Sequence, residues 1–160
     1  MVNDVLQYAW LVPVFPFVAF FLIIFFGKRM PKQGAEIGIL GMLASLGLSL
    51  LVFFETISLL SGPEGADFHG YEKSVRWLTF GPEGFFVELG VKVDGLAVVM
   101  LLVVCFVSLL VHIYSTAYMK GDKRFTFFYA VLSLFTFSML NLVLANNLIQ
   151  LLVGWEGVGV

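Results

Sequence analysis

Three ionisable side chains lie inside or at the border of long apolar stretches of the sequence: Glu55, His112 and Glu156. A charged group in hydrocarbon is costly, so such residues face a partner, a cavity or water, and in membrane proteins they often form proton relays. A carboxyl or imidazole group that gains and loses a proton does not have to carry a permanent charge. The chemistry that these residue types could support is therefore proton transfer inside a membrane.

Glu156 is the deepest of the three. It lies nine residues beyond Asn147, which is roughly 13 Å along a helix and close to the midplane of a bilayer core of about 30 Å. The glycines Gly154, Gly157 and Gly159 leave room beside it for a close helix or for water. We predict that Glu156 is a proton-relay carboxylate. The alternative is a structural role, in which it makes one buried hydrogen bond between helices.

His112 and Glu55 are weaker candidates. His112 lies eight residues before Lys120, roughly 12 Å from the membrane boundary, and the ordinary pKa of histidine near 6.5 suits proton transfer. It is a candidate relay residue, but a hydrogen-bonding role in helix packing is equally open. Glu55 is shallow, so we expect it to reach lipid headgroups or outer-loop cations such as Lys73 or Arg76.

The composition indicates a membrane protein. Of 160 residues, 60% are apolar and 12% are charged, and the mean hydropathy is +0.99, which leaves too little polar material for a water-facing surface. A net charge of −2 gives no electrostatic basis for binding nucleic acid. The single cysteine, Cys105, excludes an intramolecular disulfide, and a haem would need a second membrane histidine, whereas His69 lies in a loop.

The lengths of the apolar stretches predict an all-α polytopic membrane protein, because about 20 residues of helix cross a bilayer core. About five transmembrane helices are expected, and the prolines Pro13 and Pro16 in the first require backbone partners from neighbouring helices or water. The first stretch has no basic residues before it, which argues against a signal peptide. The fifth helix is incomplete, so we expect the chain to be an N-terminal piece of a longer polypeptide. The predicted helices are 5–27, 37–60, 95–119, 127–145 and a fifth from Leu148 onward.

The positions of the cations predict the orientation. Six of the nine Lys and Arg residues lie in two loops, at 28, 29 and 32 and at 120, 123 and 124. The positive-inside rule makes these loops cytoplasmic and places the N-terminus outside. The expected organisation is therefore helices 1 and 2 in residues 1–60, an outer, periplasmic loop in 61–94, helices 3 and 4 in 95–146, and the start of helix 5, with Glu156, in 147–160.

The outer loop carries a strand pattern. Apolar and polar residues alternate from Phe85 to Val93, and the turn-forming sequence 81–84 separates them from the stretch Arg76 to Phe80. This pattern predicts an amphipathic β-hairpin on the outer face between helices 2 and 3. It is interpreted as a cover that ties helix ends together, with a binding role as the alternative.

Several motifs together resemble the N-terminal part of subunit L, the antiporter-like chain 5, of the proton-pumping NADH:quinone oxidoreductases, known as respiratory complex I. The resemblance covers essentially the whole chain, and Gly-Trp-Glu-Gly-Val-Gly at 154–159 is its most specific part. The other motifs are Val93-Asp94-Gly95-Leu96, His112-Ile113-Tyr114-Ser115, Tyr118-Met119, Phe127-Phe128-Tyr129, Leu134-Phe135, Phe137-Ser138-Met139-Leu140 and Asn147-Leu148.

The resemblance implies a fold, a site and a setting. Members have fourteen core helices with two inverted five-helix bundles, and Glu156 would be the glutamate of helix 5 that works with a lysine on helix 7. The subunit would lie in the plasma (inner) membrane at the far end of the membrane arm, beside a subunit M-like neighbour. The resemblance implies no cofactor in this chain, because NADH, FMN, the iron–sulfur clusters and the quinone belong to partner subunits.

Two other functions stay open. Large subunits of Mrp-type sodium/proton antiporters are similar, although there the Trp-Glu pair is typically followed by Leu-Thr rather than by Gly157-Val158-Gly159. The second alternative is a structural membrane anchor without proton translocation.

Overall fold

The computed structural model describes residues 5–62, 70–80 and 85–159. Four of its helical segments are long and apolar enough to cross a membrane: Leu6–Arg29, Ala35–Ser61, Gly95–Tyr118 and Phe125–Leu144. A shorter apolar helix follows them. In chain order the elements are η1 (Leu6–Tyr8), α1 (Leu11–Phe26), η2 (Gly27–Arg29), α2 (Ala35–Ser61), β1 (Tyr71–Phe80), β2 (Phe85–Val93), α3 (Gly95–Tyr118), α4 (Phe125–Leu144) and α5 (Leu148–Gly159).

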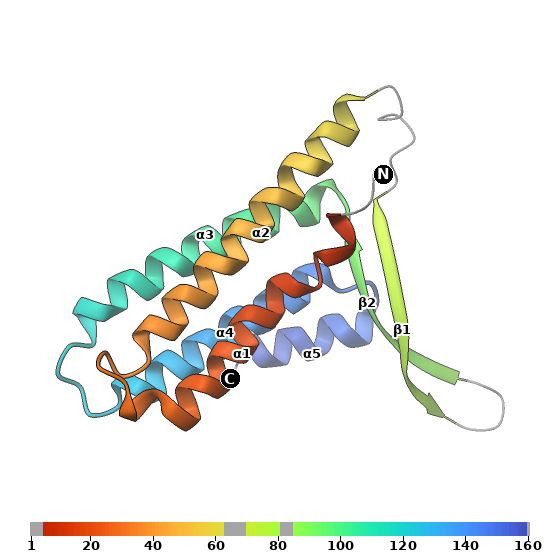
Figure 1. The fold of residues 1–160 in the computed structure, drawn as a ribbon. Helices are drawn as coiled ribbons and strands as arrows, with labels where there is room; N and C mark the ends of the chain where they lie inside the picture. The colour runs from red at the N-terminus through yellow and green to blue at the C-terminus, as the bar shows by residue number, and fades with distance from the viewer. Residues whose placement is uncertain (1–4, 63–69, 81–84, 160) are drawn as a thin grey trace.

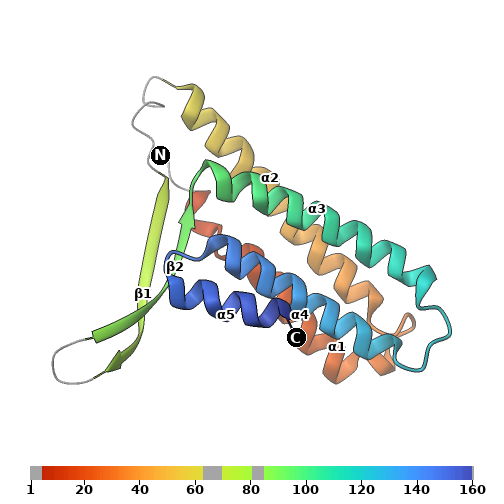
Figure 2. The same cartoon turned by 180° about the vertical axis from the view of Figure 1, so that it is seen from behind.

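The helices form one bundle, and the hairpin lies across one of its ends (Figure 1). Helix α1 packs against α2 and α4, α2 packs against α3, and α4 packs against α1, α3 and α5. Helix α5 turns back along α4, as the view from behind shows (Figure 2). The predicted fold class, an all-α polytopic bundle with a hairpin between helices 2 and 3, is confirmed.

The first helix begins later than predicted. Within the described residues η1 comes first, and α1 begins only at Leu11. Pro13 therefore falls in the first turn, where its missing N–H costs no intrahelical bond. Pro16 lies inside α1 and cannot donate to the carbonyl of Val12. The Ser45 hydroxyl of α2 donates to that carbonyl instead, at 2.9 Å. The partner expected from a neighbouring helix is therefore Ser45.

The other helix boundaries follow the sequence closely. Helix α3 begins at Gly95 because the Asp94 carboxylate accepts the N–H of Ala97 at 2.8 Å, which caps the first turn. The break before α5 falls at Asn146 and Asn147, as expected from this polar pair.

The hairpin is confirmed, but it is longer than predicted. Strands β1 and β2 pair antiparallel from Tyr71 opposite Val93 to Phe80 opposite Phe85, with one irregularity between Arg76 and Leu78. The predicted turn at 81–84 lies outside the described residues. The side chains of Val87 and Val93 are buried, whereas Val75, Trp77 and Leu89 are exposed, so only part of the apolar surface of the hairpin packs against the bundle.

Two apolar clusters fill the bundle. The larger one joins the hairpin end to the middle and includes Met42, Leu101 and Leu140. The smaller one surrounds Tyr129 with residues such as Ile23 and Ala130. Tyr129 is fully buried. Most of the remaining apolar side chains face outward, as expected for helices that meet lipid or further helices.

Candidate functional site

Glu156 lies on α5, whose direction follows from its first turn. The Asn147 side chain accepts the N–H of Gln150 at 2.8 Å, so Asn147 acts as the N-terminal cap of the helix. From this cap α5 runs back alongside α4, which crosses the length of the bundle (Figure 2). The segment therefore follows the direction of a membrane-spanning helix, as its predicted depth requires.

Small residues bring α5 close to α4. Gly154 is buried, and a Cβ there would meet the backbone N of Leu142 at 3.0 Å. A Cβ at Gly157 would collide with the Ser138 hydroxyl. The room expected beside Gly154 and Gly157 is thus occupied by α4, whereas a Cβ at Gly159 would meet nothing within 4 Å.

The Glu156 side chain points away from this contact. It lies two positions after Gly154, which is about 200° around a helix of 3.6 residues per turn, and its side chain is exposed. It shares the outward face with exposed residues such as Leu152 and Trp155. No hydrogen bond or ion pair joins the Glu156 side chain to any residue that the structure describes. Its role as a relay carboxylate is left untested by this arrangement.

His112 is placed in the opposite way, fully buried where α3 packs against α4. Its Nδ1 lies 2.8 Å from the carbonyl oxygen of Ser108, so Nδ1 carries a hydrogen and donates it. Its Nε2 lies 3.5 Å from the Ser133 hydroxyl, at the limit for a hydrogen bond. That hydroxyl also lies 3.0 Å from the carbonyl oxygen of Tyr129, to which it donates. The Ser133 oxygen then offers a lone pair to any proton that arrives at Nε2.

Sequence reasoning missed three residues that enclose His112. The Tyr129 hydroxyl donates to the carbonyl oxygen of His112 at 2.6 Å, which ties α4 to α3. Gly38 of α2 makes room for the ring, since a Cβ there would lie 3.0 Å from Cδ2 of His112 and 3.3 Å from Tyr129. The third is Ser133. A signal was present for two of them, because Tyr129 and Ser133 lie four residues apart on one helical face.

A second polar cluster was also missed, at the junction of the hairpin and α5. The Gln150 side chain accepts from the N–H of Gly90 at 2.8 Å and donates to the carbonyl oxygen of the same residue at 2.9 Å. It also donates to Asn141 of α4 at 3.1 Å. Asn147 donates to the carbonyl oxygen of Glu88 at 2.7 Å. We call Gln150, Asn147 and their partners the amide latch, and it supports the interpretation of the hairpin as a cover that ties helix ends together.

The remaining candidates are placed as follows. Glu55 is half-buried in α2, and no ion pair joins it to Lys73 or Arg76 in the described ranges. The Arg76 guanidinium instead lies 4.7 Å from the centre of the Phe86 ring. His69 is outside the described residues. His112 and Glu156 lie on different helices, α3 and α5, and no hydrogen bond between described residues links them.

Comparison with known proteins finds the same family that the sequence motifs resemble. Residues 77–129 match the family model described as NADH-ubiquinone oxidoreductase (complex I), chain 5 N-terminus. The F(420)H(2) dehydrogenase subunit L of Methanosarcina mazei is 40% identical over 160 residues, covering 99% of this chain and 22% of that protein. NADH-ubiquinone oxidoreductase chain 5 of Metridium senile is 44% identical over 135 residues, covering 84% of this chain and 21% of that protein. NADH-quinone oxidoreductase subunit L of Mycobacterium tuberculosis is 33% identical over 153 residues, covering 96% of this chain and 23% of that protein.

The chain spans about a fifth of the length of these relatives. The resemblance read from the motifs is confirmed, and together with the four apolar helices it makes the chain a multi-pass membrane protein. The chain belongs to the subunit L (chain 5) family of the complex I type and matches the N-terminal part of its members.

Proposed function

We propose that this chain is part of a proton-translocating membrane-arm subunit of a respiratory NADH:quinone oxidoreductase. The subunit moves protons across the membrane while NADH oxidation and quinone reduction proceed in other subunits. One observation carries the proposal: α5, the helix with the Gly-Trp-Glu-Gly-Val-Gly sequence, packs along α4, which is long and apolar enough to span a membrane, and this supports the expected mid-membrane depth of Glu156.

The geometry of α5 supports a relay role for Glu156. The glycine face of α5 is used for the contact with α4, so the carboxyl group points away from it and is open to approach. A proton donor or acceptor can reach it from that side. A structural carboxyl would be expected to hydrogen-bond to the helix against which α5 packs, and no described residue of α4 makes such a bond.

His112 has a secondary role in the proposal. Its Nδ1 is held by Ser108, and its Nε2 faces a hydroxyl oxygen. This arrangement accepts a proton at Nε2 without moving the ring. We assign His112 to proton transfer on the α3 side of the bundle.

The setting of the subunit is also proposed. NADH, FMN, the iron–sulfur clusters and the quinone bind to partner subunits, and a subunit M-like protein is the neighbour in the membrane arm. The six cations in the loops at 28–32 and 120–124 support a cytoplasmic position of these loops and an N-terminus outside the plasma membrane.

The experiment is Glu156→Gln in the assembled complex, reconstituted into vesicles. The change keeps the shape of the side chain and removes its titration, so fewer protons should be pumped per NADH oxidised. Glu55→Gln is the matched control and should leave that ratio unchanged. Undiminished pumping by Glu156→Gln would contradict the proposal.

The same vesicles separate the alternatives. An Mrp-type antiporter would exchange sodium for protons without NADH. A structural anchor would show reduced assembly after Glu156→Gln but an unchanged proton ratio in the complex that does assemble. The relative from Methanosarcina mazei is named for F(420)H(2), so reduced F420 is the second electron donor to test.

A further inference from the structure

Two loops meet at the end of the bundle opposite the hairpin and enclose a cavity. One loop connects η2 to α2, and the other connects α3 to α4 (Figure 1). The cavity between them has a volume of about 740 Å³. Its lining includes Lys32 and Gln33 from the first loop and Thr116, Lys120 and Lys123 from the end of α3 and the second loop.

The charge at this end is strongly positive. Lys32, Lys120 and Lys123 are exposed, and none is in an ion pair with a described residue. One carboxylate, Asp122, also lines the cavity, but its oxygen accepts the backbone N–H of Arg124 at 2.6 Å and is thereby turned to its own loop. The hairpin end differs, because there Lys92 pairs with Asp94 at 3.9 Å.

The beginning of α2 adds to the positive potential. Ala35, its first residue, lines the cavity, and Gly34 before it has no side chain to cap the first turn. A helix of 27 residues therefore presents its uncapped N-terminus here. The Ala35 N–H donates to the carbonyl oxygen of Lys32 at 3.1 Å, and Glu36 lies in the first turn. The contribution of α2 to anion binding is therefore the positive end of its helix dipole.

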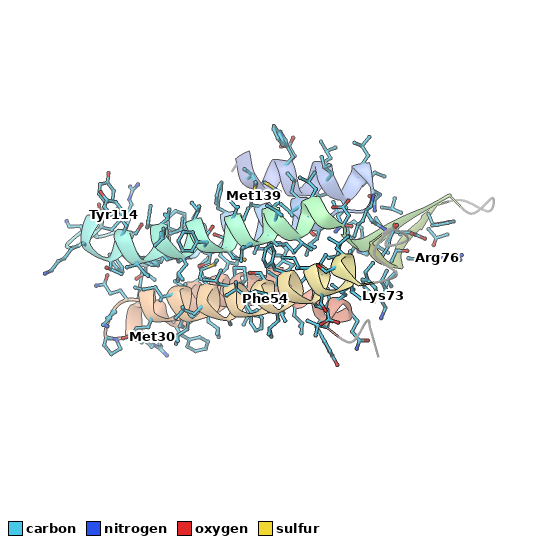
Figure 3. All side chains as sticks on the ribbon, turned by 90° about the horizontal axis from the view of Figure 1, so that it is seen from above. Met30, Phe54, Lys73, Arg76, Tyr114 and Met139 are labelled. Atoms are coloured by element: carbon cyan, nitrogen blue, oxygen red, sulfur yellow. The ribbon has the colours of Figure 1, made fainter. Side chains whose placement is uncertain are left out.

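The level of the cavity relative to the bilayer is marked by aromatic side chains. Tyr114 and Tyr118, near the end of α3, are exposed and their rings stack at 5.7 Å. Phe25 and Phe26, at the end of α1, are exposed at the same end, where Figure 3 shows Tyr114 and Met30. Exposed aromatic rings at helix ends sit at the headgroup level of a membrane. The cavity thus opens where lipid phosphates lie.

We propose that this cavity binds the phosphate headgroup of an anionic phospholipid. Three unpaired lysines and an uncapped helix N-terminus converge at headgroup depth, and basic pockets of this kind between membrane helices bind anionic headgroups. The exposed apolar surfaces of α1 and α3 next to the cavity give the acyl chains a place to lie. The site is independent of Glu156 and of proton translocation.

The test uses the assembled complex in mild detergent and photoactivatable phosphatidylglycerol, with labelled peptides quantified by mass spectrometry. The variant is Lys32→Gln, Lys120→Gln and Lys123→Gln combined. Its matched control, at the hairpin end, is Lys73→Gln, Arg76→Gln and Lys92→Gln combined. Each lysine near an anionic headgroup contributes roughly a fivefold gain in affinity, so the triple variant should need about a hundredfold more lipid for half-maximal labelling of residues 28–34 and 116–125.

The control should be labelled like the unchanged protein, and photoactivatable phosphatidylcholine should label these residues weakly in every variant. Equal labelling of the triple variant and the unchanged protein would overturn the proposal, as would equal labelling by phosphatidylcholine. Displacement of the lipid by millimolar inorganic phosphate would show that the site recognises free phosphate, which also overturns it. If the triple variant does not assemble, Lys123→Gln alone should weaken labelling roughly fivefold.

Discussion

The surroundings of His112 and Glu156 differ. His112 is buried where α3 packs against α4, whereas Glu156 lies exposed on the outward face of α5. At His112, small residues on neighbouring helices make room for the ring, and hydroxyl and carbonyl groups meet both of its nitrogens. At Glu156, the small residues belong to the same helix and lie on its other face, where they bring α4 close. The position of the small residues, rather than the presence of a charge, decides whether the group is enclosed or open.

The largest expected effect comes from a substitution beside the buried His112. In Gly38→Val, the added carbon atoms would press on the rings of His112 and Tyr129, so we expect the free energy of unfolding to fall by about 3 kcal/mol. The measurement is SDS titration of the full-length subunit in mixed micelles. Gly47→Val on the same helix is the control, because a Cβ at Gly47 meets nothing within 4 Å, and it should be close to neutral. Equal losses in the two variants would contradict the proposed packing role of Gly38.

The next effect concerns the buried face of α5. Gln150→Leu leaves the N–H and the carbonyl oxygen of Gly90 without their partner, and we expect a loss of about 2 kcal/mol. The same titration measures it. Leu152→Gln on the exposed face is the control for adding or removing one amide on this helix. A Gln150→Leu variant as stable as the unchanged protein would show that the amide latch does not hold the hairpin.

A smaller effect tests the link between α3 and α4. Tyr129→Phe removes the hydroxyl that donates to the carbonyl oxygen of His112, and the expected loss is about 1 kcal/mol. Tyr114→Phe changes an exposed hydroxyl on α3 and should leave stability unchanged. Thermal unfolding in detergent separates the two variants. Equal midpoints would show that the bond from Tyr129 to the carbonyl oxygen of His112 does not stabilise the contact between α3 and α4.

The smallest effect on stability is expected at the open site. Glu156→Gln should change the free energy of unfolding by less than about 0.5 kcal/mol, because the side chain has no described partner to lose. Proton pumping by the same variant should nevertheless fall, as proposed above. A large loss of stability in the full-length subunit would instead mark Glu156 as a packing residue and would remove its contrast with His112.

The sequence predicted most of the fold because its signals were local. The lengths of the apolar stretches defined the helices, and the alternation from Phe85 to Val93 defined a strand. The start of α1 was predicted too early, because a hydropathy count cannot see that Pro13 belongs in a first turn. Counting residues also predicted a mid-membrane depth for Glu156, which stays a prediction. The count could not show on which face of α5 the side chain lies, since nearly every other side chain of α5 is apolar or a glycine.

The surroundings of the candidate sites depended on contacts between distant segments. Gly38 and His112 are 74 positions apart in the sequence, and the contact between them arises only when α2 packs on α3. The bonds between Gln150 and Gly90 join residues 60 positions apart. The amide of Gln150 inside an apolar stretch was a visible signal. Its partner could not be predicted, because it is a backbone group, and every residue has one.

The bonds made by Gln150 also bear on how the hairpin meets other chains. The backbone groups of Gly90 point away from β1, so a single side chain occupies the place that one residue of a third strand would take. A bare strand edge invites edge-to-edge pairing and aggregation. At this position the membrane helix itself closes the β2 side, so any strand that extends the sheet past Gly90 has to add along β1.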